Sequence, residues 1–339
     1  MRHITFLILL LAPVTLAEPA AAPPVCEACA AEPSPACALT ADLLSALDAK
    51  QKAKAQMAWD SPDRVHWNFL PMAFRKGLPL AEMTPEQQRK VWTLLGVMLS
   101  PDALAQARMT LDREAKLAVL EKSPTRDPGR YFITVFGDPA AKVPWGFSFE
   151  GHHLSLNFSF DKGQPTSVTP MFFGANPATV GDEVKAAAPR ATLYQDEDTR
   201  LLAFYAALTP EQQAKAQMAA KVAQAASGGG GASPKLPEKP VGLCAADMTP
   251  AQRAAFLALI RVQADKAQAG FAKGVMKEVE KEDAAKQFFG WTGEPKAGEV
   301  HMCLIQTGVV CVFVDAQAGH GPPKANHLHT LWRRVGKDF

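Results

Sequence analysis

Apolar positions follow helical spacing in some stretches and alternate in others, and these stretches predict the elements of the first half. Thr84-Pro85-Glu86-Gln87 has the residues of a helix N-cap, and apolar residues from Val91 to Met98 form one helical face behind it. A helical block from Leu43 to Lys122 therefore precedes a block of strands. The strands are predicted where β-branched and aromatic residues are frequent, at 130–136, 145–160 and 166–173.

The second half repeats this order. Helical patterns, with Thr-Pro caps at Thr209 and Thr249, cover 201–208, 209–226 and 249–287, and strands follow at 300–306, 309–315 and 327–333. Helices followed by strands predict an α+β fold on an antiparallel sheet, and the recurrence predicts an internal duplication. The predicted organisation is a signal peptide at 1–17, a Pro/Ala-rich leader at 18–38, a first half at 39–226, a flexible Gly/Pro linker or loop at 227–241, and a second half at 242–339 packed with the first as one body.

The composition of the 339 residues excludes several classes of protein. An apolar fraction of 47% supplies a packed core, so the chain as a whole is not intrinsically disordered. The 36 lysines and arginines nearly balance 34 acidic residues, and the lack of a basic excess argues against a nucleic-acid partner. No Gly-x-Ser-x-Gly, phosphate-loop or His-Glu-x-x-His motif is present, so those catalytic classes are not indicated.

The N-terminal residues predict export. Arg2, the apolar run Ile4–Ala12 and the segment Thr15-Leu16-Ala17 form the three regions of a cleaved signal peptide. The apolar run is shorter than the roughly 20 residues of a spanning helix, and no other stretch reaches that length. The expected location is therefore periplasmic or extracellular, with no membrane span in the mature chain.

Six cysteines in an exported chain favour disulfides. Cys303 and Cys311 flank a predicted hairpin of strands 302–305 and 309–314, whose three-residue loop would place them opposite each other. They are the pair that we expect to be bonded. Cys26 and Cys29 have the spacing of a redox or zinc half-site, but they lie in the leader, and a tethering disulfide is the preferred interpretation.

Histidine is the main signal for chemistry, because four of the eight fall in two motifs, Gly151-His152-His153 and His327-Leu328-His329. His327 and His329 are two apart on a predicted strand, so their imidazoles lie on one face about 6.5–7 Å apart. In a regular strand only one of His152 and His153 would join that face, and Glu150 shares the face of His152. These histidines predict a zinc or copper site; the alternative is hydrogen bonding within a polar sheet face.

Further predictions concern acid–base chemistry and ligand binding. Glu150 follows Phe149 and lies near Trp145, so burial is expected to raise its pKa and make it a catalytic base. Arg75 and Arg333 are candidates to bind a carboxylate or phosphate, and Asn157 is a third ligand-binding candidate. For each of these residues a structural ion pair or hydrogen bond is the alternative.

Several longer motifs occur in a fixed order from about Leu43 to Phe339. They are Arg75–Leu80, Met83–Gln87, Trp145-Gly146, Glu150–Phe158, Phe172–Pro177 and Asn326–Arg333. In these motifs the chain resembles the family catalogued as domain of unknown function 3500. The resemblance implies a secreted or periplasmic protein of bacterial type and no particular reaction. The Ala-rich leader, the cysteines, and residues 228–231 and 316–324 depart from the family pattern.

The leading functional hypothesis is an exported protein with a histidine-rich site for a metal or small ligand, in which metal-activated water carries out hydrolysis. One alternative is a non-enzymatic periplasmic protein that binds an anionic small molecule through Arg333 and the histidines. The other is an interaction scaffold without a site. An intact histidine cluster favours the first, a shallow basic groove the second, and dispersed histidines the third.

Overall fold

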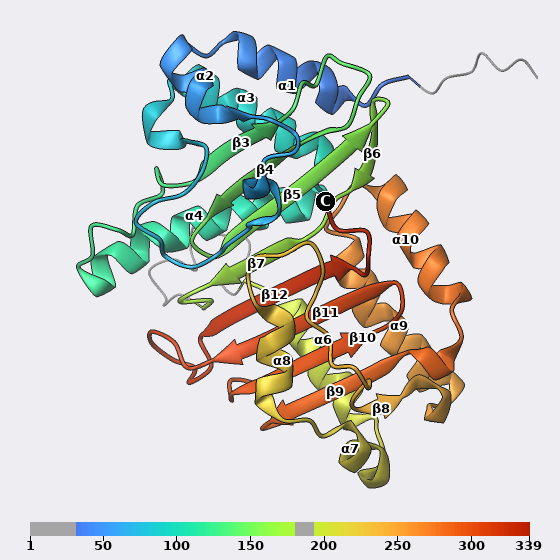
Figure 1. The fold of residues 1–339 in the computed structure, drawn as a ribbon. Helices are drawn as coiled ribbons and strands as arrows, with labels where there is room; N and C mark the ends of the chain where they lie inside the picture. Colours follow the sequence, from blue (N-terminus) through green and yellow to red (C-terminus); the bar gives the residue numbers. More distant parts are fainter. Residues whose placement is uncertain (1–31, 180–192) are drawn as a thin grey trace, which may run out of the picture. The chain divides into compact units, whose positions relative to one another are not determined.

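One large sheet organises the chain in the computed structural model, which describes residues 32–179 and 193–339 (Figure 1). The strand order is β1-β3-β4-β5-β7-β12-β11-β10-β9-β8, with β2 also paired to β3 and β6 to β5. Among these pairs only β1 and β3 run parallel, and the predicted α+β class is confirmed. The strands are β1 (Gln56–Met57), β2 (Leu78–Pro79), β3 (Phe132–Phe136), β4 (Trp145–Gly151), β5 (Leu154–Asp161), β6 (Gln164–Ser167), β7 (Met171–Ala175), β8 (Leu243–Cys244), β9 (Phe288–Gly293), β10 (His301–Gln306), β11 (Val310–Gln317) and β12 (His327–Arg334).

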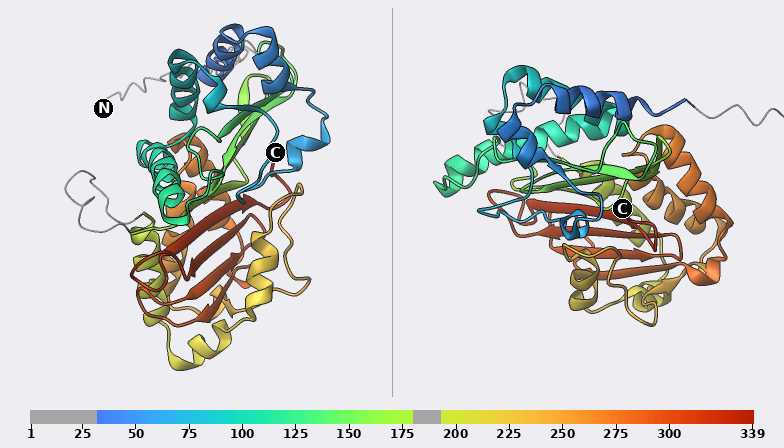
Figure 2. Two further views of the ribbon diagram at one scale, coloured as in Figure 1. Left: turned by 90° about the vertical axis from the view of Figure 1, so that its left-hand side faces the viewer. Right: turned by 45° about the horizontal axis from the view of Figure 1, so that its top comes forward.

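Most helices pack on one face of this sheet, while α8 and the segment 58–76 cover the other face (Figures 1 and 2). We call these the helix face and the loop face. The helices are α1 (Pro35–Ser45), α2 (Ala49–Ala55), α3 (Pro85–Met98), α4 (Pro101–Glu121), α6 (Gln195–Ala206), α7 (Pro210–Ala216), α8 (Ala220–Ser227), α9 (Pro250–Ala264) and α10 (Ala269–Lys281), with 3₁₀ turns at Pro62–Val65, Leu80–Glu82, Ala245–Asp247 and Ala284–Lys286.

Strand alternation separates two hydrophobic cores. On β11, Val312 and Val314 point into the larger core under the helices, whereas Cys311 and Phe313 point into the smaller core of the loop face. On β4 the aromatic residues Trp145, Phe147 and Phe149 all point into the larger core, so the polar residues between them face the loops. The fold therefore buries both faces of the sheet.

Helix caps follow the sequence motifs closely, and one pattern of contacts occurs twice. Thr84 and Thr249 cap α3 and α9, each with a glutamine at the third helical position. Gln87 exchanges side-chain amide hydrogen bonds of 3.0 and 2.9 Å with Gln51, the capping glutamine of α2. In the same way Gln252 exchanges bonds of 3.0 and 2.8 Å with Gln212, the capping glutamine of α7. Each pair of amides joins the start of a short helix to the start of a longer one.

The predicted disulfide between Cys303 and Cys311 is wrong. In the β10–β11 hairpin Cys303 pairs with Val314 and Cys311 pairs with Gln306, so the register differs by three positions from the predicted one. An odd shift reverses the face of every side chain, and Cys303 and Cys311 consequently lie in different cores as free thiols. Burial raises the pKa of both thiols. The predicted signal peptide, Cys26 and Cys29 lie outside the described residues.

The segment 227–241 is a loop packed on the sheet. Gly231 accepts a hydrogen bond of 2.8 Å from Arg333, and Leu236 and Val241 pack against the smaller core. The leader, predicted to extend to residue 38, gives way to α1 at Pro35. Pro33–Phe339 forms one compact unit. Within the residues that the structure describes, every helix is too short or too polar to cross a lipid bilayer.

Candidate metal centre

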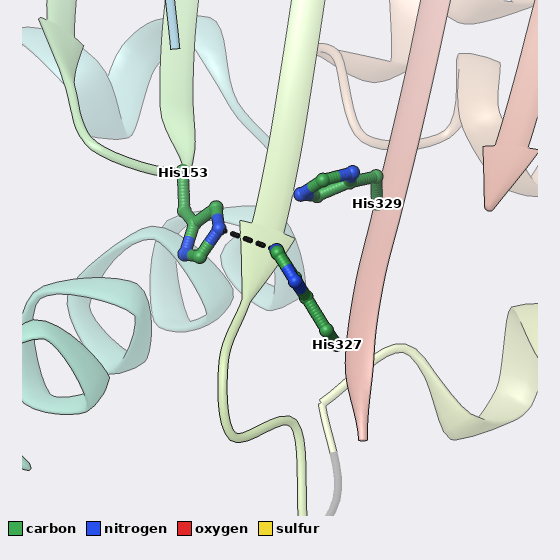
Figure 3. A group of neighbouring side chains, drawn as sticks. All are labelled: His153, His327 and His329. Carbon is green, nitrogen blue, oxygen red and sulfur yellow. Dashed lines mark hydrogen bonds between the residues drawn. The ribbon is translucent and has the colours of Figure 1, made fainter. Parts of the chain in front are cut away.

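His153 lies in the tight turn that joins β4 to β5. Its backbone has a φ of +62°, which is uncommon for a residue other than glycine. Two backbone hydrogen bonds hold this conformation: the His153 N–H donates to the Phe69 carbonyl at 3.0 Å, and the His153 carbonyl accepts from the Gly174 N–H at 2.7 Å. The imidazole consequently reaches toward β12 (Figure 3).

His327 and His329 come from β12, two residues apart, and their imidazoles lie on one face as the sequence predicts. The Nε2 atoms of His153 and His327 are 2.8 Å apart (Figure 3). One ring nitrogen of each of the three histidines lies within 4.8 Å of the others. Three side chains from two distant parts of the chain therefore converge on one point.

The ring of His329 is held from behind by β11. Its Nδ1 lies 3.5 Å from Asp315 Oδ2 and 3.3 Å from Gln317 Nε2, and the Gln317 amide also donates to the same carboxylate oxygen. The carboxylate favours a proton on Nδ1 and the amide N–H group opposes it, so the two neighbours act in opposite directions on the tautomer. With the proton on Nδ1, Nε2 carries the lone pair that a metal needs. This Nε2 is buried and has no hydrogen-bond partner in the described part of the chain.

Small and aromatic neighbours shape the space around the rings. Phe69 stacks on Phe172 with ring centroids 3.8 Å apart, and both rings flank His329. A Cβ added at Gly174 would lie 2.8 Å from Cδ2 of His329 and 3.1 Å from Cδ2 of His153. Because Gly174 has no side chain, the imidazoles of His153 and His329 can both pack against its Cα.

Burial keeps the imidazoles of His153 and His327 neutral. His153 is only 4% exposed, and His327 is partly buried. Desolvation, together with the neighbouring imidazoles, lowers the pKa of His153 well below its usual range and that of His327 to about 3. A neutral imidazole carries the lone pair that a metal needs, so these two histidines are in their ligand form at neutral pH.

The geometry fits a tetrahedral transition-metal ion. Zinc binds histidine nitrogens at about 2.0–2.1 Å, which places the nitrogens of a tetrahedral set about 3.3 Å apart. The 2.8 Å between His153 and His327 needs only a small outward adjustment to reach that separation. The Asp315 carboxylate behind His329 is the kind of outer partner that orients a metal-binding histidine.

His152 belongs to a neighbouring group. Its Nδ1 lies 2.6 Å from Glu114 Oε2 of α4, and its ring stacks on that of His153 with centroids 3.7 Å apart. Glu114, His152 and His153 also lie close enough to share a cation. The Arg126 guanidinium, however, is 3.1 and 3.3 Å from the two ring nitrogens of His152 and would repel a cation there. Of the four predicted histidine ligands, three therefore face one another and His152 supports His153.

Glu150 does not join the histidines. Its carboxylate is buried on the loop face, 3.1 Å from Lys76 Nζ, and it accepts a weak hydrogen bond from Ser155. Burial raises its pKa as predicted, against the opposing charges of Lys76 and Arg75. Glu150 and His152 do not share a face as the sequence predicts, because His152 follows the end of β4 and contacts Glu114 of α4.

The remaining ligand-binding candidates lie away from the histidine cluster. Arg333 is buried in an ion pair with Asp338 at 2.6 Å. Asn157 donates to the Pro170 carbonyl at 2.8 Å and to Ser155 Oγ at 3.2 Å. Both side chains thus have structural partners. Arg75 lines a groove next to Glu150 on the loop face.

Sequence reasoning missed the residues that support the three histidines. Asp315 ends the strand predicted at 309–315 and Gln317 lies beyond it, and their pairing with His329 and His327 requires the sheet register. Glu114 lies on a predicted helix, and Gly174 lies in a predicted family motif with no indication of its steric role.

Comparison with curated proteins and with solved structures finds no match. The sequence profile of one protein family covers nearly the entire chain, including every residue of the histidine cluster. That family is described as Protein of unknown function (DUF3500), it matches residues 30–339, and the chain belongs to it.

Proposed function

We propose that this protein binds one zinc or copper ion through His153, His327 and His329. The observation that carries the proposal is the buried Nε2 of His329, which has no partner although it faces two other imidazoles. A buried ring nitrogen without a partner is costly, and with the proton on Nδ1 a metal ion on Nε2 would satisfy it. The pKa values lowered by burial support the same conclusion, because they keep His153 and His327 neutral.

Hydrolysis by metal-activated water is the reaction that such a centre suits best. Three histidine ligands leave a fourth tetrahedral position for water, whose pKa a zinc ion lowers to about 7. Glu150, the base expected from the sequence, is engaged with Lys76 on the loop face, so we assign it no part in this chemistry.

Metal content tests this proposal directly. Protein purified without a histidine tag or chelator is expected to contain close to one zinc or copper ion per chain by elemental mass spectrometry. Apoprotein is expected to take up the same amount from solution. A chain that holds no metal, even with zinc or copper added, contradicts the proposal.

Replacing Gly174 with alanine is expected to weaken metal binding about tenfold or more while leaving the fold intact. The new methyl group would press on the rings of His329 and His153 and displace their nitrogens. Competition against a chromophoric chelator measures the affinity. The control is Gly274→Ala in α10, where an added Cβ meets nothing within 4 Å. Equal affinities in both variants would contradict this role of Gly174.

The alternative of a non-enzymatic protein that binds an anion through Arg333 has less support. The Asp338 carboxylate already compensates the Arg333 guanidinium, and both groups are buried. An anion at that position would have to displace an internal counter-ion.

The location and the internal duplication remain proposals. We infer a periplasmic or extracellular location from the N-terminal signal pattern in residues 1–17. The reciprocal amide pairs Gln51–Gln87 and Gln212–Gln252 support two related halves. This correspondence matches α6 and α7 with α1 and α2, so it favours a second half that begins before the 227–241 loop.

A further inference from the structure

A groove of about 470 Å³ opens on the loop face, separate from the residues of the histidine cluster. Its lining includes the carboxylate of Glu150, two cationic residues that precede β2, and the apolar side chains of Trp67, Met72 and Phe74. Its volume is in the range of small-molecule sites, which combine an apolar lining with a few polar groups.

The base of the groove holds a compensated ion pair. Lys76 Nζ lies 3.1 and 3.3 Å from the two carboxylate oxygens of Glu150 and donates to the His66 carbonyl at 2.6 Å. All three protons of the ammonium group are thereby used. Because the two charges cancel, this pair gives the groove no net charge.

Arg75, in contrast, forms no direct ion pair with a carboxylate in the described chain, and its guanidinium donates to the backbone carbonyls of Asn68, at 2.7 Å, and Leu70. It is partly buried, and desolvation lowers its pKa, while the charge of Glu150, which Lys76 already engages, acts in the opposite direction. Asp63, the other acidic residue of the lining, is exposed and lies 3.8 Å from His66. A partly buried guanidinium without a direct carboxylate partner is stabilised by an anion, so the groove favours a negatively charged occupant.

Trp67 contributes a buried side chain to the wall of the groove. Its indole N–H has no acceptor among the described residues, but this nitrogen is itself shielded from solvent, so an occupant of the open groove does not reach it. Arg75 is therefore the group that an acid group would meet.

The outer part of the groove is apolar and held in place. Phe74 is 88% exposed, and Met72 is 41% exposed. Their loop is fixed because Arg130 donates to the carbonyls of Met72, at 3.2 Å, and Ala73. Exposed apolar side chains on a tethered loop are typical of a binding surface.

We infer that this groove binds an organic carboxylate with an apolar chain, its acid group meeting Arg75 and its chain covering Met72 and Phe74. The site is independent of the proposed metal centre, since none of these side chains belongs to the histidine cluster. The occupant resembles a medium-chain fatty acid in its chemistry.

Titration calorimetry with decanoate, in the presence of a chelator, tests this inference. Decanoate is expected to bind with one-to-one stoichiometry, and decylammonium, which has the same chain and the opposite charge, is expected to bind at least about tenfold more weakly. Binding is expected to persist in a His327→Ala/His329→Ala protein, so loss of the metal centre and loss of this site give different results.

Two variants locate the binding site. Arg75→Met removes the charge and is expected to weaken decanoate binding about tenfold or more. Because Arg75 also holds its own loop, Phe74→Ser provides a second test on a fully folded chain, and Val143→Ser, another exposed apolar residue, is its matched control. The inference is overturned if decanoate does not bind, if decylammonium binds as tightly, or if neither Arg75→Met nor Phe74→Ser weakens binding relative to Val143→Ser.

Discussion

Replacing both His327 and His329 with alanine is expected to reduce zinc affinity by roughly a thousandfold or more, because two of three protein ligands are lost. His153 would remain with only one ring nitrogen at the centre. The variant is expected to fold. His327 is partly exposed, and the Nε2 of His329 makes no hydrogen bond within the described chain that alanine would remove. Metal content and affinity are therefore expected to fall without a change in secondary structure.

Thermal unfolding gives an independent measure of the same loss. A ligand that binds only the folded state at a thousand times its Kd stabilises that state by about 4.1 kcal/mol. Zinc is therefore expected to raise the Tm of the unmodified protein by several degrees and to leave that of the double variant unchanged. His66→Ala is the matched control, because this exposed histidine lies outside the cluster. If zinc raises the Tm of the double variant as much as that of the unmodified protein, the assignment of His327 and His329 as ligands is wrong.

Local sequence patterns were sufficient for the elements whose determinants are contiguous in the chain. The Thr-Pro-x-Gln caps at Thr84, Thr209 and Thr249 begin α3, α7 and α9 as predicted. The shared face of His327 and His329 also follows from period-two alternation alone. These features depend on neighbours within a few residues.

Features that depend on strand register or on turn conformation could not be predicted from local sequence patterns. The last pair of the β10–β11 hairpin is Gln306 with Cys311, and not Ile305 with Val309 as predicted, and the resulting three-position shift of register separated Cys303 from Cys311. A regular strand allowed either His152 or His153 to join the cluster, and the positive φ at His153 decides between them. That conformation is held by hydrogen bonds from distant residues.

The surroundings of Glu150 also depend on contacts between distant parts of the chain. The sequence correctly indicated a buried carboxylate with a raised pKa. Its partner, Lys76, is 74 residues away along the chain and reaches it only after the segment 58–76 folds over the loop face. A raised pKa showed that Glu150 is buried, but the position of its partner decides what it does.

Acidification is expected to destabilise the metal-free protein between about pH 6.5 and pH 3, through His327 and His153. Both have a lower pKa in the folded chain than their usual 6.5, to about 3 for His327. Below pH 6.5 the unfolded chain takes up protons that the folded chain excludes, so the stability present above pH 6.5 is lost as the pH falls. A histidine that stays neutral in the folded chain at pH 4.5 lowers the free energy of unfolding at that pH by about 2.7 kcal/mol.

Urea unfolding at pH 7 and pH 4.5, with chelator present, measures this loss. Other groups titrate in the same range, Glu150 among them with the opposite sign because its pKa is raised. The comparison with His327→Gln isolates the histidine: glutamine cannot be protonated, so the variant is expected to lose about 2–3 kcal/mol less than the unmodified chain. Saturating zinc should shift the onset of the loss to lower pH, because protons and metal compete for the same nitrogens. Equal losses in the two proteins would mean that His327 is protonated in the folded chain at pH 4.5, which would contradict the lowered pKa of this histidine.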